Sequence, residues 1–400
     1  MRESVQGDRK LEVRSSDIFE WLVLFLVAAV VTVLLVPLVR RLAIRLDAID
    51  YPSARRVNKK PVPRMGGLAI LGGLVAALIV LLLGRACFGW GDPFISHSSL
   101  DDVSYAGVGV AVLVMFAVGA IDDVVSLNPK VKLLGQILAA CIAVASGLVL
   151  SSIKAPLGPG TWNFGWFSYP LTVFYLVAFA NVINLIDGLD GLAAGITAIS
   201  GSAIFVLAVM TGRPDAAVMC MALVGACIGF LRYNFYPASI FMGDSGSLLL
   251  GFGLGVVSLF AAARASTFVS LLVPLLAAGV PILDTAFAIV RRVRTHQPID
   301  APDKGHIHHR LMDSGLSQRT SVLIMWAWTA ALSVCGILIT ALDGLVRNLA
   351  IVVVVIITAY GVFKLNLLHP VLAHHYHPRG RKEDVAEDED GEDNDGEGSS

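Results

Sequence analysis

Charged residues are scarce in this chain. Of its 400 residues only 15% are charged, whereas water-soluble domains carry roughly 25%. The hydrophobic share is 56%, and the mean hydropathy is +0.74. A surface with so little charge must face mostly something other than water, which excludes an ordinary soluble domain.

Cysteines are also few, and their spacing has no pattern. There are five, and no two of them form a Cys-x-x-Cys pair. This argues against a disulfide framework and a cysteine-based zinc site, so we interpret them as small apolar fillers. The net charge is only −1, and we expect no nucleic-acid partner. The sequence also lacks the inverted repeat that many secondary transporters contain.

Long apolar runs are abundant instead. A helix needs about 20 apolar residues to cross a hydrocarbon core, and about eleven runs are long enough. We therefore predict an all-α, polytopic membrane protein with about eleven transmembrane helices. The first run is too long for a cleaved signal peptide and is followed by basic residues. The predicted spans are 18–40, 66–84, 105–121, 131–150, 168–186, 192–212, 215–233, 246–264, 267–290, 321–342 and 346–366.

Composition divides the chain into three parts. Residues 1–15 form a polar N-terminal tail, and residues 16–368 form the membrane domain. Residues 369–400 end in a run of carboxylates without an apolar cluster. Such a run repels itself and cannot bury a core, so we expect a disordered cytosolic tail.

Basic residues are distributed unevenly between the two sides of the predicted membrane. With eleven spans and the N-terminus outside, 21 of the 30 lysines and arginines lie on the inner side. The positive-inside bias therefore predicts this orientation. The same topology gathers four polar patches on the cytosolic side, so we expect one active-site cleft facing the cytosol. The patches are 119–132, 181–192, 241–247 and 291–311.

The first patch contains two adjacent acids, Asp122 and Asp123, at the end of the third span. Carboxylates near a bilayer are costly, so they generally have a function or a cationic partner. Lys132 begins the next predicted helix and can reach back toward them. A structural ion pair at this loop is the alternative interpretation.

The second patch repeats a polar residue at every third position. These residues are Asn181, Asn184, Asp187 and Asp190. On a helix Asn184 and Asp187 share a face, whereas Asn181 and Asp190 diverge unless the helix breaks, and the glycines at 188 and 191 offer such a break. Four polar groups on an apolar span are expensive without ligands. Amides that pack helices together, with a cap, are the alternative.

The third patch places Asp244 between glycines just before an apolar span. Glycine lets a phosphate approach the backbone, and the following helix start offers N–H groups to an anion. Asp244 and Asn184 would supply oxygen ligands of the kind that Mg²⁺ accepts. Helix capping by Asp244 or Ser245 is the alternative.

The fourth patch is a loop that is dense in cations and imidazoles. A positive-inside anchor explains its arginines at 291–294, but not the sequence HIHHR at 306–310. Zinc would have no cysteine partner here, and imidazoles that donate hydrogen bonds to a phosphate or a sugar fit better. Acids for a metal, cations for phosphates and amides for a sugar together suit phosphoryl transfer.

Five motifs now carry a resemblance. They are DYPSARRVNKKPVPRMGG from residue 50, DDVVSLNPKVKLLGQ from 122, NVINLIDGLDGLAAG from 181, FMGDSGSLLLG from 241 and PDKGHIHHRL from 302. In this order the chain resembles the polyprenyl-phosphate N-acetylhexosamine-1-phosphate transferases. It is most similar to the bacterial branch that makes polyprenyl-diphosphate N-acetylglucosamine. The first motif departs slightly, because Asn58 replaces a frequent His and Arg56 a frequent Lys.

The resemblance implies an N-out fold of about eleven spans in the bacterial cytoplasmic membrane, with a homodimer as a candidate assembly. It implies that N-acetylhexosamine-1-phosphate passes from a UDP-sugar to a polyprenyl phosphate, with release of UMP. That reaction would be the first step of a lipid-linked cell-envelope glycan. The implied cofactor is Mg²⁺, with Mn²⁺ as an alternative.

The resemblance also implies roles for individual residues. Asn184 and Asp244 would ligate the metal, and Lys132 would contact phosphate. Gly188, Leu189, Asp190 and Phe241 would line the uridine site, with Phe241 stacked on uracil. The remaining expectations concern the loop histidines and the acids. They assign substrate contacts to His306, His308, His309, Arg310 and Asn181, and catalytic roles to Asp122, Asp123 and Asp187.

The acceptor phosphate has a second pKa of about 6, so near neutral pH it needs no strong base. We expect direct in-line attack, with the main barrier being the approach of two anions. One alternative activity is the phospho-N-acetylmuramoyl-pentapeptide transferase reaction, whose enzymes tend to carry three adjacent histidines where this chain has HIHH. A remote alternative is an ion-coupled transporter, which would bury its acids near the midplane rather than at one rim.

Overall fold

The computed structural model describes residues 15–52, 60–94, 103–154, 160–263, 268–294, 296, 305–342 and 344–364. Residues 1–14 of the predicted N-terminal tail and the whole predicted acidic tail lie outside this set. So does most of the loop between residues 295 and 304.

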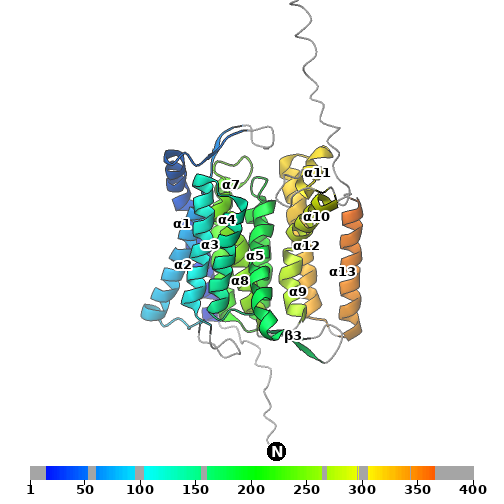
Figure 1. Ribbon diagram of the computed structural model, residues 1–400. Coiled ribbons are helices and arrows are strands. Elements are labelled where there is room, and N and C mark those ends of the chain that lie inside the picture. The colour runs from blue at the N-terminus through cyan, green and yellow to red at the C-terminus, as the bar shows by residue number, and fades with distance from the viewer. Residues whose placement is uncertain are drawn as a thin grey trace, which may run out of the picture.

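The described chain is built almost entirely of helices (Figure 1). Two short antiparallel hairpins interrupt them: β1 (Ile49–Asp50) with β2 (Val62–Pro63), and β3 (Ser152–Lys154) with β4 (Thr161–Asn163). A 3-10 turn, η1 (Gly165–Phe167), precedes α5. The helices are α1 (Ser15–Arg45), α2 (Gly67–Phe88), α3 (Tyr105–Val125), α4 (Pro129–Ala145), α5 (Ser168–Ile186), α6 (Leu192–Met210), α7 (Pro214–Asn234), α8 (Gly243–Ala263), α9 (Phe268–Ala277), α10 (Gly279–Arg294), α11 (Ile307–Asp313), α12 (Gln318–Thr340) and α13 (Gly344–Lys364).

Eight of the described helices are long and apolar enough to cross a membrane: α1 to α3, α5 to α8, and α12. The bent pair α9 and α10 brings the number to nine if it forms one span. Helix α4 has 17 residues, and the apolar part of α13, Gly344–Tyr360, is also short. The all-α, multi-pass prediction is confirmed, whereas the count of eleven and the outside N-terminus stay predictions.

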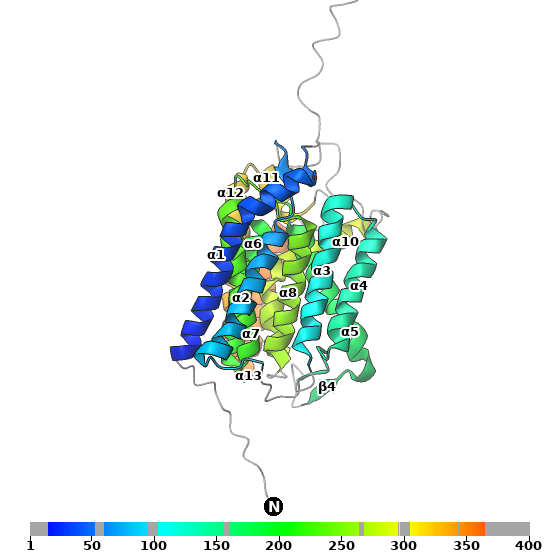
Figure 2. The ribbon, with the colours of Figure 1, turned by 90° about the vertical axis from the view of Figure 1, so that its left-hand side faces the viewer.

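Helix α8 forms the centre of the bundle, and 94% of its apolar window is buried inside the protein. By contrast only 28% of the windows of α1 and α3 is buried. Along α1, exposed leucines such as Leu22, Leu26 and Leu34 form an apolar outer face, as a lipid-facing helix requires. Figure 2 shows α1 and α2 at one side of α8, and α3 and α4 at the other.

Two glycines let neighbouring helices approach the first turn of α8. A Cβ at Gly67 would collide with the backbone of Ser245 and Gly246, and a Cβ at Gly119 would collide with the carbonyl of Asp244. Helices α2 and α3 therefore pack directly on the α8 backbone. This close packing fixes the position of Asp244 relative to the end of α3.

The predicted span 267–290 differs from the structure, because it breaks at Ala278 into α9 and α10, which meet at 71°. Pro281 has no N–H to donate to the carbonyl of residue 277, and its ring disfavours a continuous helix. The bend carries α10 toward α11 at one end of the bundle (Figure 1).

The polar patches of the sequence collect at that same end. The turns joining α3 to α4, α5 to α6 and α7 to α8 lie there together with α11, whereas the β3–β4 hairpin lies at the opposite end (Figures 1 and 2). The predicted convergence of the four patches thus follows from the alternating direction of the helices.

Candidate active site

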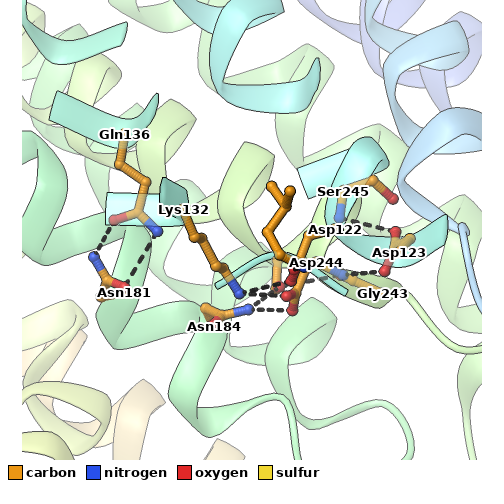
Figure 3. A network of polar contacts seen from close by, with 11 residues as sticks. Asp122, Asp123, Lys132, Gln136, Asn181, Asn184, Gly243, Asp244 and Ser245 are labelled. Atoms are coloured by element: carbon orange, nitrogen blue, oxygen red, sulfur yellow. Dashed lines mark hydrogen bonds and ion pairs between the residues drawn. The ribbon is translucent and has the colours of Figure 1, made fainter. Parts of the chain in front are cut away.

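A lysine between two carboxylates joins α3, α4 and α8 (Figure 3). The turn after α3 uses Ser126 at φ 55°, and the Asn128 side chain accepts the Lys130 N–H at 2.9 Å to start α4. Lys132 then lies one turn inside α4. Its Nζ is 3.2 Å from Asp122 Oδ2 and also forms an ion pair with Asp244.

Asn184 links this cluster to the end of α5. Its Nδ2 donates to Asp244 Oδ1 at 2.7 Å and to Ser247 Oγ at 2.8 Å. Residues from three sequence motifs, each more than fifty positions from the next, therefore meet at Asp244. Lys132, Asn184 and Asp244 thus lie in mutual contact, and the metal and phosphate roles expected of them stay predictions.

Asp123 caps the beginning of α8. Its two oxygens accept the backbone N–H groups of Asp244 at 2.8 Å and Ser245 at 3.0 Å. Gly243 precedes them at φ 71°, and a Cβ there would lie 2.5 Å from an Asp123 oxygen. The sequence offered Asp244 or Ser245 as the capping residue, but a carboxylate from another helix fills that role. Asp244 thus keeps its side chain for other partners.

The predicted break in the second patch is confirmed. Helix α5 ends at Ile186, and Gly191 at φ 79° precedes α6. Asn234 holds the turn by accepting the Gly191 N–H at 3.0 Å, and Asp190 accepts the Ala238 N–H at 2.9 Å. Asn181 instead faces α4 and donates to Gln136 Oε1 at 2.6 Å.

A cleft of about 770 Å³ opens beside these residues. Ten of the residues predicted for the site line it, and five do not. Asp122 and Lys132 lie just behind Asp244, and Asn181, His306 and Arg310 point elsewhere. The predicted residues that line the cleft are Asp123, Asn184, Asp187, Gly188, Leu189, Asp190, Phe241, Asp244, His308 and His309.

The first motif of the sequence supplies a wall of the cleft that we did not assign. Asp50, Lys60 and Arg64 line it, on or beside the β1–β2 hairpin. The hairpin is tied to the third patch, because Phe241 N–H donates to Pro63 O at 2.8 Å and Gly66 N–H donates to Phe241 O at 3.0 Å. Strands of two residues leave no periodic signal, so the sequence could not place this wall.

The buried acid Asp284 was also missed. It lies in α10, where Oδ2 pairs with His306 Nδ1 and Oδ1 accepts the Ile307 N–H, both at 2.8 Å. A single carboxylate inside the apolar run 279–290 was the available signal. His306 therefore turns away from the cleft, whereas the next two histidines line it.

The electrostatics of the cleft favour a bound cation and a neutral imidazole. Burial, and after it the negative charge of Asp244, Asp123 and Asp190, together raise the pKa of Asp187 to about 8. Burial also raises the pKa of Asp190. The pKa of His308 falls to about 3, first through burial and then through His309. Without a ligand, Asp187 is mostly protonated near pH 7, and His308 is uncharged.

Asp187 should make the ligand-free protein less stable at high pH. The unfolded chain loses this proton near its ordinary pKa of 3.8, whereas the folded protein keeps it to about pH 8. The unfolded state then binds fewer protons over that interval, so stability falls as pH rises. Asp187→Asn should therefore melt above wild type at about pH 9, and the difference should shrink toward pH 5. Thermal unfolding in detergent without divalent metal measures this, and a difference independent of pH would contradict it.

The donor set at Asp244 suits a shared magnesium site rather than a closed cage. Within the described ranges, no group of three or more His, Cys, Asp or Glu side chains is arranged to hold a metal. Mg²⁺, however, commonly takes one or two protein oxygens and completes its shell with waters and substrate phosphates. The carboxylate of Asp244 fits that pattern. The amide nitrogen of Asn184 faces Asp244 in this structure, so its oxygen would join a metal there only after the amide turns over. The excess of carboxylates in the cleft favours a cation.

Comparison with known proteins identifies the family of this chain. The family model described as glycosyl transferase family 4 matches residues 105–262, which hold the first three patches. The chain is 41% identical over 304 residues to the probable undecaprenyl-phosphate N-acetylglucosaminyl 1-phosphate transferase of Bacillus subtilis strain 168, covering 76% of this chain and 80% of the relative.

Two further relatives span most of the chain. The decaprenyl-phosphate N-acetylglucosaminephosphotransferase of Mycolicibacterium smegmatis is 38% identical, covering 83% of this chain and 86% of the relative. The phospho-N-acetylmuramoyl-pentapeptide-transferase of Moorella thermoacetica is 34% identical, covering 78% and 95%. With such identity over most of both chains, this membrane protein belongs to glycosyl transferase family 4.

Proposed function

We propose that this protein transfers N-acetylglucosamine-1-phosphate, or a related N-acetylhexosamine-1-phosphate, from a UDP-sugar to a membrane polyprenyl phosphate and releases UMP. The observation that carries the proposal is the Lys132–Asp244–Asn184 cluster at the wall of the cleft. The names of two relatives specify an N-acetylglucosamine phosphotransferase that acts on a polyprenyl phosphate. A cleft of about 770 Å³ falls within the usual size range of small-molecule sites.

The chemical problem is to bring one phosphate up to another. The acceptor is already mostly dianionic near neutral pH, so a strong base is not required. Consistent with this, both oxygens of Asp123 hold the α8 backbone, and Asp122 holds Lys132 and the Leu127 N–H at 2.6 Å. We therefore propose that Asp122 and Asp123 hold Lys132 and the start of α8 in place around the metal site. Asp187 would be the acid in the cleft that can carry a proton near neutral pH.

Asp244 and Asn184 would hold Mg²⁺ against the donor diphosphate, and Mn²⁺ would suit the same oxygens. When bound, the metal supplies positive charge that neutralises the diphosphate and the departing UMP. Lys132, which forms an ion pair with Asp244, could then exchange this partner for a substrate phosphate. This makes direct in-line attack without a covalent enzyme intermediate the simplest path.

The remaining cleft residues would bind the nucleotide and the sugar. Phe241 offers a ring for uracil, and Gly188, Leu189 and Asp190 form the turn beside it. His308 and His309 would donate hydrogen bonds to the diphosphate or the sugar. His306 and Arg310 act from behind them, and Asn181 supports α5 through Gln136.

The cleft would open to the cytosol of a bacterial cell, beneath the cytoplasmic membrane. Many described basic residues lie at its end of the bundle, including those at the end of α1, in the first turn of α4 and at the end of α10. The positive-inside bias favours the cytosolic side for that end. UDP-sugars are made there, so the donor would reach the cleft without crossing the membrane.

Donor choice separates this proposal from its nearest alternative, which the Moorella thermoacetica relative exemplifies. The purified protein should release UMP from UDP-N-acetylglucosamine in the presence of polyprenyl phosphate and Mg²⁺. Mass spectrometry should then find the lipid-linked sugar diphosphate. Release of UMP only from UDP-N-acetylmuramoyl-pentapeptide would establish the alternative, and ion flux in liposomes without UMP release would indicate a transporter.

Arg64 is expected to strengthen binding of a phosphate. It lines the cleft, and its Nε is buried without a hydrogen-bond partner in the described part of the chain. Because a buried N–H without an acceptor is costly, an anionic ligand that accepts from this Nε suits the site. Arg64→Ala should raise KM about 10-fold for the substrate whose phosphate it meets. If KM rises for the UDP-sugar alone, Arg64 contacts the donor phosphates. If KM rises for polyprenyl phosphate alone, Arg64 contacts the acceptor phosphate. The exposed Arg45→Ala at the same end is the control, and unchanged KM for both substrates would contradict the expectation.

A further inference from the structure

Asp284 uses both of its oxygens to hold the start of α11. The side chain is only 2% exposed, and it lies on α10 beyond the 71° bend. One oxygen accepts the backbone N–H of Ile307, the first residue of α11, and the other meets the His306 ring, both at 2.8 Å. The first N–H groups of a helix have no partner within the helix, so the carboxylate satisfies a donor that would otherwise be unpaired.

The Asp284 contact also determines which ring nitrogen of His306 carries a proton. A carboxylate can only accept, so the proton between them resides on His306 Nδ1. The ring is thereby held in one orientation. His306 lies parallel to His308, with ring centroids 5.6 Å apart and planes at 9°. Through this stacking the position of one imidazole determines that of the next.

Among the described residues, no hydrogen bond orients the His308 ring. Its Nδ1 is buried, and within the described residues no partner for that atom exists. On the cleft side the ring packs against the backbone at Gly188, where a Cβ would lie 2.9 Å from Nε2. On the other sides it contacts His306 and His309. The His309 ring centroid lies 4.3 Å from that of His308. Packing alone therefore sets its orientation.

We infer that Asp284 is a positioning residue for the cleft histidines: through His306 and the Ile307 N–H it sets where His308 and His309 meet the substrate. The inference rests on the proposed function. Asp284 lies on α10 and does not line the cleft, yet it would control how His308 and His309 contact the UDP-sugar. Asp284 does not touch substrate itself.

Kinetics of two substitutions provide the first test. Asp284→Ala removes both acceptors and should lower kcat/KM for UDP-N-acetylglucosamine about 10²-fold, the cost of a small misplacement at a reacting centre. Asp284→Asn keeps one acceptor for the Ile307 N–H, so its kcat/KM should fall by about 10-fold or less. Asp92→Ala is the control, because Asp92 pairs with Arg85 at the opposite end of the bundle. Wild-type kcat/KM in both Asp284 variants would overturn the inference.

A double-mutant cycle with His308→Ala separates positioning from a general structural role. If Asp284 acts through His308, Asp284→Ala should lower kcat/KM by no more than about threefold in the His308→Ala background. The same loss in both backgrounds would overturn the inference. Should Asp284→Ala fail to fold, as thermal unfolding in detergent would reveal, the cycle is run with Asp284→Asn and decides by the same criterion. Absence of UMP release from wild type would instead refute the proposed function.

Discussion

Asp244→Asn is expected to lower the rate of UMP release about 10³-fold, even at saturating Mg²⁺. Asp244 is the point at which Lys132 from α4 and Asn184 from α5 meet the first turn of α8. Asparagine keeps the shape of the side chain but removes the charge that would hold a divalent cation. Its amide would also face the Lys132 ammonium, donor against donor. Rates of UMP release over a range of Mg²⁺ concentrations measure the effect.

The matched control is Asp92→Asn. It makes the same chemical change in a carboxylate that also pairs with a cation, Arg85, but at the end of the bundle away from the cleft. The control should retain wild-type turnover. Near-normal activity of Asp244→Asn at high Mg²⁺ would contradict the metal assignment. A phosphorylated aspartate trapped on the wild-type enzyme would contradict direct transfer instead.

Much of the site could be predicted because its residues violate the apolar pattern around them. Asn184, Asp187 and Asp244 interrupt runs that otherwise suit a membrane, and a polar group there requires a reason. The glycines at 188 and 191 predicted the break between α5 and α6, which the structure confirms. Alternating helix direction then gathered the patches at one end without further information.

The remainder depended on tertiary contacts that leave no local signature. Asp123 caps α8 across more than a hundred residues, so its pattern in the sequence was indistinguishable from that of Asp122. The β1–β2 wall rests on two-residue strands held by the loop at Phe241. Asp284 was hidden because a predicted continuous span gave no reason for α10 to turn toward α11. Pro281 was the local cue for that bend.

Lys132 compensates the charge of two acids that would otherwise repel each other. Its Nζ lies between Asp122 and Asp244, and α4 positions it through the Asn128 cap one turn earlier. Asp122 is in turn held by the Leu127 N–H at 2.6 Å. The lysine therefore has a defined position before any substrate arrives. Preorganised positive charge of this kind lowers a barrier without reorganisation during the reaction.

Lys132→Met should accordingly reduce kcat about 10²-fold at saturating Mg²⁺, because the incoming phosphate loses its nearest fixed cation. Lys132→Arg keeps the charge but spreads it over a planar fork, so an intermediate rate is expected. Lys130→Met is the matched control: it removes an exposed lysine two residues earlier in the same helix turn, and it should leave kcat unchanged. Equal rates for Lys132→Met and Lys130→Met would mean that Asp244 needs no ammonium beside it. The lysine would then be a structural counter-ion, and the charge that permits two phosphates to meet would have to come from the metal and the β1–β2 wall.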